Sequence, residues 1–165
     1  MRSELYWING PWPGKLALSA RPRGRDWLSD EIDGWKREGV NSVLSLLTAE
    51  EEGELDLTQE AKESRRQGLR YSSFPIPDRQ VPQSEAEFNA ALTQVEEDLS
   101  AGRKVLVHCR QGVGRTGLVA ACLLIRNGMS SDAAIEAVSA ARGVAIPETN
   151  EQRDWIEHYA PALTK

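Results

Sequence analysis

The chain has 165 residues and a net charge of −5, from 20 lysines and arginines against 25 aspartates and glutamates; 40% of its residues are apolar and 27% charged. These values are typical of one soluble globular domain, which at this length buries roughly 70% of its unfolded surface. The mild acidity argues against non-specific nucleic-acid binding, and no run approaches the roughly 20 apolar residues of a membrane helix.

The first part of the chain predicts strands and short helices in alternation. After an opening rich in proline and glycine, Leu16 to Leu18 is expected to form a strand. Ser29 is a candidate N-cap of a helix that ends at Gly39. The run from Val40 to Leu47 is too apolar for a strand with one wet face. It therefore predicts a sheet that is covered on both sides.

An acidic stretch separates this strand from the next pair of predicted elements. Thr58 is a candidate cap of a polar helix that ends at Gly68, and Leu69 to Phe74 predicts another strand. The sequence Pro75-Ile76-Pro77-Asp78 then predicts a stiff loop, because both prolines fix φ and lack an amide proton.

The second half of the chain contains the most clearly specified helix. Residues 84–87 (Ser-Glu-Ala-Glu) form a capping-box pattern, and apolar residues follow at helical spacing: Phe88, Leu92, Val95 and Leu99. Gly102 ends this helix, and a short buried strand is expected at 104–107. Further helices are predicted from Leu118 to Ile125, which stops near Gly128, from Ser131 to Gly143, and from a cap at Thr149-x-x-Gln152.

Strands that alternate with helices predict an α/β fold with a mostly parallel central sheet flanked by helices on both faces. The sequence contains no internal repeat and no linker that would divide the chain. We therefore expect a single domain over residues 1–165, with a core at about 16–159.

The segment from Val105 to Leu118 carries the candidate chemistry. A strand ends near Cys109, a glycine-rich loop follows, and a helix begins at about Arg115. Gly112 and Gly114 allow successive amides to point at one centre, and the helix N-terminus adds its positive end there. Such a field stabilises a phosphate dianion and favours the thiolate form of a cysteine at its base. We expect Cys109 to be a nucleophile and Arg115 to bind two phosphate oxygens.

Two other phosphate motifs fit this segment less well. Gly112-x-Gly114-x-x-Gly117 matches a dinucleotide fingerprint, but the residues after Gly128 look helical where that fold needs a second strand. The fingerprint also gives no role to Cys109 or Arg115. A Walker loop is excluded because the chain has no Gly-Lys-Ser/Thr triplet.

The pattern His108-Cys109-x5-Arg115-Thr116-Gly117 resembles the signature phosphate-binding loop (P-loop) of the cysteine-dependent protein tyrosine phosphatases. With its Pro75–Asp78 loop and its Ile146–Gln152 segment, the short chain is similar to the compact dual-specificity branch, especially kinase-associated phosphatase-like members. The resemblance extends from about Leu16 to Tyr159. It implies hydrolysis of a phosphate monoester through a phosphocysteine intermediate, without a metal or an organic cofactor.

The resemblance also implies a role for each matching residue. Cys109 is the nucleophile, Arg115 clamps the phosphate, and Asp78 is the general acid that later activates water. Thr116 would hydrogen-bond the sulfur and help it leave, Gln152 would position the hydrolytic water, and His108 would orient the loop. The phosphate would rest on the backbone amides of Arg110, Gln111, Gly112, Val113, Gly114 and Arg115.

Each role has a plainer alternative. Cys109 could be a buried structural thiol, Asp78 a surface turn residue, and Gln152 only the partner of Thr149 in a capping box. Cys122 is expected to fill core space. The basic run of Arg21, Arg23 and Arg25 is expected to be a solvated loop, which would attract phosphorylated substrates only if it borders the pocket.

We therefore expect a phosphatase that acts on phosphotyrosine, and on phosphoserine or phosphothreonine if the pocket allows it. Two cysteines are too few for a disulfide framework or a metal cage, and the N-terminus lacks a signal pattern, so a cytoplasmic protein is expected. We also expect a monomer, although no sequence feature determines the oligomeric state. Its partner would be a phosphorylated protein or peptide, not nucleic acid or a membrane. The alternatives are a phosphatase of phosphoinositides, nucleotides or RNA ends, and a non-catalytic phosphate-binding module.

Overall fold

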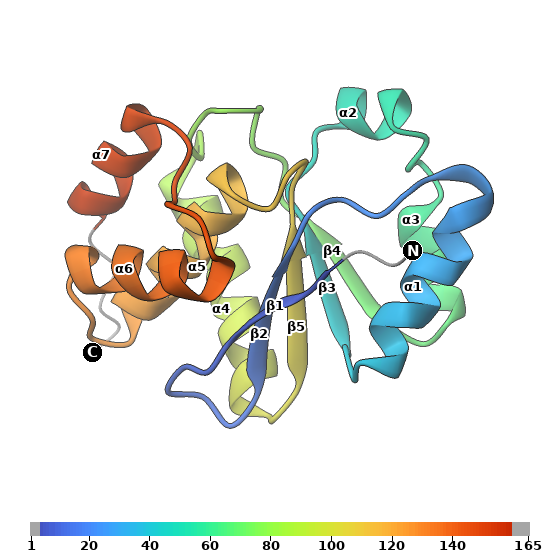
Figure 1. The fold of residues 1–165 in the computed structure, drawn as a ribbon, viewed down its shortest axis with the longest axis horizontal. Helices are drawn as coiled ribbons and strands as arrows, with labels where there is room; N and C mark the ends of the chain where they lie inside the picture. The colour runs from blue at the N-terminus through green and yellow to red at the C-terminus, as the bar shows by residue number, and fades with distance from the viewer. Residues whose placement is uncertain (1–3, 160–165) are drawn as a thin grey trace.

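The computed structural model describes residues 4–159, in which five strands form one central sheet (Figure 1). The strands are β1 (Tyr6–Ile8), β2 (Lys15–Ser19), β3 (Ser42–Ser45), β4 (Arg70–Ser73) and β5 (Lys104–His108). Their order is β1-β2-β5-β3-β4, and every neighbouring pair is parallel except β1 with β2. The predicted mostly parallel sheet is confirmed.

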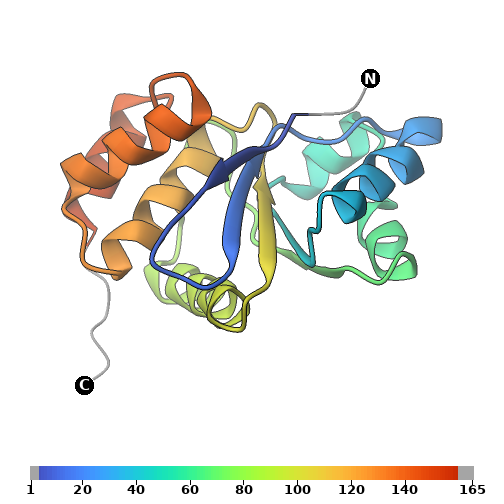
Figure 2. The same cartoon turned by 60° about the horizontal axis from the view of Figure 1, so that its bottom comes forward.

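Helices cover both faces of this sheet, as Figure 2 shows. One face carries α1 (Leu28–Arg37) and α3 (Glu60–Arg66). The other carries α4 (Glu85–Ser100), α5 (Gly114–Arg126), α6 (Ser131–Arg142) and α7 (Asn150–His158). A short helix, α2 (Ala49–Glu54), lies beyond the carboxyl end of β3.

The central strand β5 shows why two covered faces follow from an apolar run. Val105 and Val107 belong to the larger core, against α4 to α7, whereas Leu106 between them belongs to the smaller core, against α1. Side chains of a strand alternate between its faces, so an unbroken apolar strand needs apolar partners on both sides.

Two predicted helix starts are wrong. Ser29 lies inside α1, whose N-cap is Trp27, because the 3-10 turn Arg25–Trp27 runs directly into the helix. Thr58 is likewise not a cap, since α3 begins after Gln59. The predicted ends are confirmed, because both Gly39 and Gly68 have a positive φ.

Besides the 3-10 turn Arg25–Trp27, two elements were not predicted, β1 and α2. The acidic stretch after β3 forms α2, which begins with a reciprocal capping box between Thr48 and Glu51. The Glu51 amide donates to Thr48 Oγ1 at 3.2 Å, and the Thr48 amide donates to Glu51 Oε1 at 3.1 Å. This box fixes the glutamate side chain at the carboxyl end of the sheet.

The helices of the second half follow their expected caps closely. Ser84 Oγ accepts the Glu87 amide of α4, and Thr149 and Gln152 form a complete capping box at α7. Helix α6 begins at Ser131 as predicted, and its N-cap is Ser130, whose side chain accepts the Ala133 amide. Cys122 is fully buried in α5, as predicted, and burial raises the pKa of its thiol. Within residues 4–159, every helix is too short or too polar to span a membrane.

Candidate active site

The loop between β5 and α5 emerges at the carboxyl end of the central strand, between β2 and β3. Ligands of open α/β sheets usually bind at this end. Cys109 follows β5 directly and is only 3% exposed. The Gly112 amide turns back toward it and donates to its Sγ at 3.3 Å.

Gly112 is required at its position for two reasons. Its φ is +75°, which disfavours residues with a side chain, and a Cβ there would lie 2.6 Å from the backbone of Ser19 on β2. The loop therefore packs directly on the neighbouring strand, and this contact keeps its amide directed at the sulfur.

The loop is also held from outside by Arg142 of α6. Its Nε donates to the Gly112 carbonyl at 3.0 Å and its Nη2 to the Gln111 carbonyl at 3.2 Å. Because these carbonyls point outward to Arg142, the loop can turn amides inward. The N-cap of α5, Val113, offers no side-chain acceptor, so the first amides of α5 stay available to an anion. Nothing in the sequence indicated a role for Arg142.

Arg115 is the most heavily engaged side chain of the site, and it is 1% exposed. Its Nη1 donates to Glu51 Oε1 at 2.6 Å and to the Ile76 carbonyl at 2.8 Å. Its Nη2 donates to Glu51 Oε2 at 2.8 Å and to Asp78 Oδ1 at 3.1 Å. All four Nη hydrogens are thereby used, and within residues 4–159 only Nε–H of the guanidinium has no such partner.

Glu51 is the functional residue that the sequence reasoning missed. Burial tends to raise its pKa, but hydrogen bonds from Arg115 and Thr48 outweigh that effect and leave the pKa below its ordinary value. For Arg115, burial tends to lower the pKa. The hydrogen bond from Arg115 to Glu51, together with the charges of Cys109, Glu51 and Asp78, outweighs that effect and raises the pKa above its ordinary value. The two side chains therefore form a bidentate ion pair, which fixes the direction of the guanidinium. The available signal was Thr48-x-x-Glu51, a capping-box pattern.

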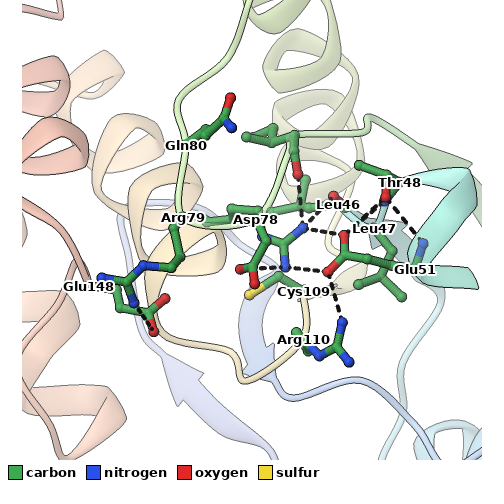
Figure 3. Close-up of polar contacts among 12 residues, drawn as sticks. Leu46, Leu47, Thr48, Glu51, Asp78, Arg79, Gln80, Cys109, Arg110 and Glu148 are labelled. Carbon is green, nitrogen blue, oxygen red and sulfur yellow. Dashed lines mark hydrogen bonds and ion pairs between the residues drawn. The ribbon is translucent and has the colours of Figure 1, made fainter. Parts of the chain in front are cut away.

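Asp78 lies beside Cys109, on the loop that leaves β4, and its side chain is 48% exposed (Figure 3). The proline-bounded loop is anchored by the Ile76 amide, which donates to the Leu46 carbonyl at 3.1 Å. Beyond Asp78, Arg79 pairs with Glu148 at 3.1 Å. The structure thus brings the predicted acid, arginine and cysteine together.

Gln152 is fully buried and acts as a cap. Its Oε1 accepts the amides of Thr149 and Glu148, both at 3.2 Å. Its Nε2 donates to the Gln80 carbonyl at 3.0 Å, which ties α7 to the loop that carries Asp78. The capping interpretation is confirmed, and positioning of water remains a prediction.

Thr116 and the basic run complete the predicted set. Thr116 Oγ1 is buried and has no hydrogen-bond partner within residues 4–159, so the predicted bond to the sulfur is not formed in this structure. Arg23 pairs with Glu31, and Arg25 pairs with Asp56 at 2.8 Å. Only the backbone of Arg21 reaches the loop, where its amide donates to the Arg110 carbonyl at 3.2 Å.

A small cavity of about 30 Å³ lies over these groups. It is lined by Asp78, Cys109, Arg110, Gln111, Gly114, Arg115 and Glu148. A wider groove of about 390 Å³ adjoins it along α2 and shares Asp78 and Arg110 with it. A phosphate ester could thus reach Cys109 through the cavity while its remaining part lies in the groove.

Comparison with known families agrees with this geometry. Residues 46–160 match the family model described as "Dual specificity phosphatase, catalytic domain", which is well over half of the chain. The chain belongs to the dual-specificity phosphatase family. The matched region contains Asp78, Cys109 and Arg115, together with Glu51.

Several relatives of this dual-specificity phosphatase domain carry recognised names. It is 27% identical over 138 residues to the "Cyclin-dependent kinase inhibitor 3" of Rattus norvegicus, covering 82% of this chain and 65% of that protein. It is 32% identical over 121 residues to the "Dual specificity protein phosphatase 2" of Homo sapiens, covering 72% and 35%. The chain therefore spans less than two thirds of the length of these curated relatives.

Solved structures share the fold. A kinase associated phosphatase (KAP) with serine in place of its catalytic-site cysteine has a TM-score of 0.86 at 23% identity, covering 94% of this chain and 93% of that one. The active form of Tk-PTP has a TM-score of 0.77 at 29% identity, covering 94% and 97%. The α/β architecture predicted from the sequence is that of the phosphatases.

Proposed function

We propose that this chain hydrolyses phosphoprotein monoesters through a phosphocysteine intermediate on Cys109. The observation that carries the proposal is the convergence of three groups at one cavity: the sulfur with the Gly112 amide directed at it, the guanidinium of Arg115, and the carboxyl group of Asp78. A nucleophile, an oxyanion clamp and a general acid are the groups that phosphoryl transfer requires.

Substrate binding changes the partners of Arg115. A phosphate group needs two parallel N–H donors for bidentate binding, and Nε–H alone provides one. The second must come from Nη2, whose hydrogens are held by Glu51 and Asp78. Because the Glu51 pair is bidentate and buried, the half-exposed Asp78 is the group that the phosphate displaces. Displacement leaves the Asp78 carboxyl group beside the leaving-group oxygen.

The reaction then proceeds in two balanced steps. Once displaced from Arg115, the Asp78 carboxylate takes up a proton from the solvent. The Cys109 thiolate attacks phosphorus in line, the bond from phosphorus to the ester oxygen breaks, and Asp78 gives that proton to the ester oxygen. Asp78, now a carboxylate, takes a proton from water; the water oxygen attacks phosphorus, and the S–P bond breaks to release inorganic phosphate and the thiolate. Thr116 is proposed to assist the departing sulfur, and the amides of residues 110–115 to bind the phosphoryl oxygens.

A phosphatase of non-protein esters is the second candidate. The chain is 33% identical over 102 residues to the Arabidopsis thaliana protein named "Phosphatidylinositol 3,4,5-trisphosphate 3-phosphatase and protein-tyrosine-phosphatase PTEN1". The resemblance implies lysines inside the loop for lipid-directed members, whereas this loop has Arg110, Gln111 and Val113. This composition favours the phosphoprotein proposal.

Phosphate release in EDTA from matched phosphotyrosine and phosphothreonine peptides, with a phosphoinositide and a small aryl phosphate alongside, tests the function. We expect turnover of at least one peptide, none by Cys109→Ser, and slow turnover by Asp78→Asn. Cleavage of the phosphoinositide without either peptide would support the second candidate. Binding of phosphate without any turnover would contradict both and indicate a phosphate-binding module.

The proposed enzyme acts as a monomer in the cytoplasm, as expected from the sequence. Sedimentation of the purified protein over a range of concentrations would test the monomer, with a concentration-dependent dimer as the contradicting result.

A further inference from the structure

A buried pair of titratable side chains lies directly behind the nucleophile. His108 precedes Cys109, and its Nε2 lies 2.6 Å from Glu60 Oε2 on α3. Both side chains are 0% exposed. The other ring nitrogen, Nδ1, lies 3.3 Å from the carbonyl oxygen of Cys109. The ring thus connects α3 to the first peptide of the phosphate-binding loop.

The two contacts of the ring determine where its protons lie. A carbonyl oxygen only accepts hydrogen bonds, so the Nδ1 contact requires a proton on Nδ1. The short Nε2 contact requires a second proton between Nε2 and the carboxyl group. The pair is therefore either imidazolium with carboxylate or imidazole with carboxylic acid, and it is neutral overall in both forms. The remaining state, an ionised Glu60 with a proton only on Nε2, would bury a net charge.

The surroundings disfavour that charged state. Oε1 of Glu60 has no hydrogen-bond partner within residues 4–159. Facing the pair are Glu52 on α2, Tyr71 on β4 and, on α1, the Trp35 ring with its centroid 6.0 Å from that of His108. Burial and then the negative charge of Glu60 raise the pKa of Glu52, and the same two effects raise the pKa of Tyr71. In the charged state of the pair, the carboxylate of Glu52 would therefore be a second negative charge close to that of Glu60.

The orientation of one peptide follows from the Nδ1 proton. In a trans peptide the C=O and the next N–H point in opposite directions. When the Cys109 carbonyl is held toward His108 in the interior, the Arg110 amide of the same peptide points out, toward the cavity above Cys109. That amide is the first of those proposed to bind phosphate.

We propose that Glu60 is a positioning residue of the active site, which fixes the Nδ1–H form of His108 and thereby aims the Arg110 amide at the substrate phosphate. Glu60 touches no substrate and acts only through His108. The importance of the amide for phosphoryl transfer rests on the proposed function, whereas the proton on Nδ1 does not. Neither the resemblance nor the sequence pattern gave Glu60 a role.

Glu60→Gln and Glu60→Leu form a matched pair for the test. A glutamine amide donates to Nε2 and so keeps the proton on Nδ1, whereas leucine has similar size and offers no hydrogen bond. We expect Glu60→Gln to bind inorganic phosphate and to turn over an aryl phosphate much as the wild type does. We expect Glu60→Leu to lose about 10- to 100-fold in kcat/KM, somewhat less than removal of a whole oxyanion donor, and to bind inorganic phosphate more weakly.

The ring protons are read directly by ¹⁵N NMR of histidine-labelled protein. The chain has two histidines, and replacement of the exposed His158 by Asn leaves only His108. We expect one form with a protonated Nδ1 in the wild type and in Glu60→Gln. In Glu60→Leu we expect a mixture of Nδ1–H and Nε2–H forms, because only the Cys109 carbonyl then favours the proton on Nδ1.

Three results would overturn the proposal: an unprotonated Nδ1 in the wild type, unchanged ring signals and kcat/KM in Glu60→Leu, or a Glu60→Gln protein that folds but is as defective as Glu60→Leu. If Glu60→Leu does not fold, the proposal is still tested by the wild-type NMR spectrum and by the activity of Glu60→Gln. A wild-type protein without esterase activity would contradict the proposed function, and the NMR signals would still test the pair.

Discussion

Substitution of Glu51 by glutamine is expected to weaken both the fold and the reaction. Glu51 accepts two hydrogen bonds from Arg115, at 2.6 and 2.8 Å, and only 7% of its side chain is exposed. Removing one partner of a buried ion pair costs about 3–5 kcal/mol. In the variant, Arg115 keeps its bonds to Asp78 and the Ile76 carbonyl, and the glutamine keeps one acceptor. We therefore expect the free energy of unfolding to fall by about 2–3 kcal/mol.

Thermal unfolding measures this loss. In a chain of this length, each kcal/mol of lost stability lowers Tm by about 2–4 °C, so we expect Tm to fall by about 4–12 °C. The matched control is Glu54→Gln, also on α2, because Glu54 is exposed and its nearest basic atom, on Arg110, is 3.9 Å away. A surface pair of this kind contributes at most about 1 kcal/mol. We also expect a lower kcat for Glu51→Gln only, because the guanidinium loses its fixed direction.

The effect of Glu51→Gln depends on pH with a defined sign. The pKa of Glu51 in the folded protein lies below its ordinary value, despite the burial that opposes this, because of Arg115 and Thr48. The ion pair therefore stabilises the fold above the pKa of an unfolded glutamate, about 4.3, and loses this contribution as pH falls through the lower folded pKa. The difference in free energy of unfolding between the wild type and Glu51→Gln should be constant from neutral pH to about pH 5 and should shrink at lower pH. Equal Tm values at neutral pH would refute the reasoning.

Three further substitutions test separate parts of the site. Gly112→Ala should abolish phosphate binding and lower Tm, because a Cβ would lie 2.6 Å from the backbone of Ser19. The control Gly128→Ala also has a positive φ but meets open space, so it should lower the free energy of unfolding by only about 1 kcal/mol and leave phosphate binding intact. Asp78→Asn should lower kcat by about 10²- to 10⁴-fold. Inorganic phosphate should bind to this variant at least as tightly as to the wild type, because the phosphate no longer has to displace a carboxylate from Arg115. Weaker binding by calorimetry would contradict the proposed displacement of Asp78. Burial and the charge of Glu60, partly offset by His108, raise the pKa of Glu52, so its ionisation opposes folding as pH rises. Glu52→Gln should therefore raise Tm more at pH 7 than at pH 4, and a decrease at pH 7 would contradict this.

The nucleophile and the acid could be predicted from local sequence because each belongs to a contiguous motif. The loop from Cys109 to Arg115 lies between a strand and a helix that both have strong patterns, and Asp78 follows two prolines that define its loop. The fold followed from the same signals, since uniformly apolar strands require helices on both faces.

The supporting residues could not be predicted because they come from distant parts of the chain. Glu51, Glu60 and Arg142 lie on three different helices and meet the loop only through the sheet order. Glu60 and Arg142 have no local motif, and a polar residue on a short helix is usually solvated. For Gln152 the local motif was informative: the capping pattern with Thr149 fixed its observed bonds.

The most direct test of the account is to trap the covalent intermediate. The protein is mixed with an aryl phosphate in EDTA, quenched with acid within the first turnover and digested, and the cysteine peptides are examined by mass spectrometry. The account predicts a phosphoryl group on the Cys109 peptide, retained in Cys122→Ala and absent in Cys109→Ser. Turnover by Cys109→Ser, or rapid hydrolysis by wild type and Asp78→Asn without any phosphoryl group on Cys109, would contradict it.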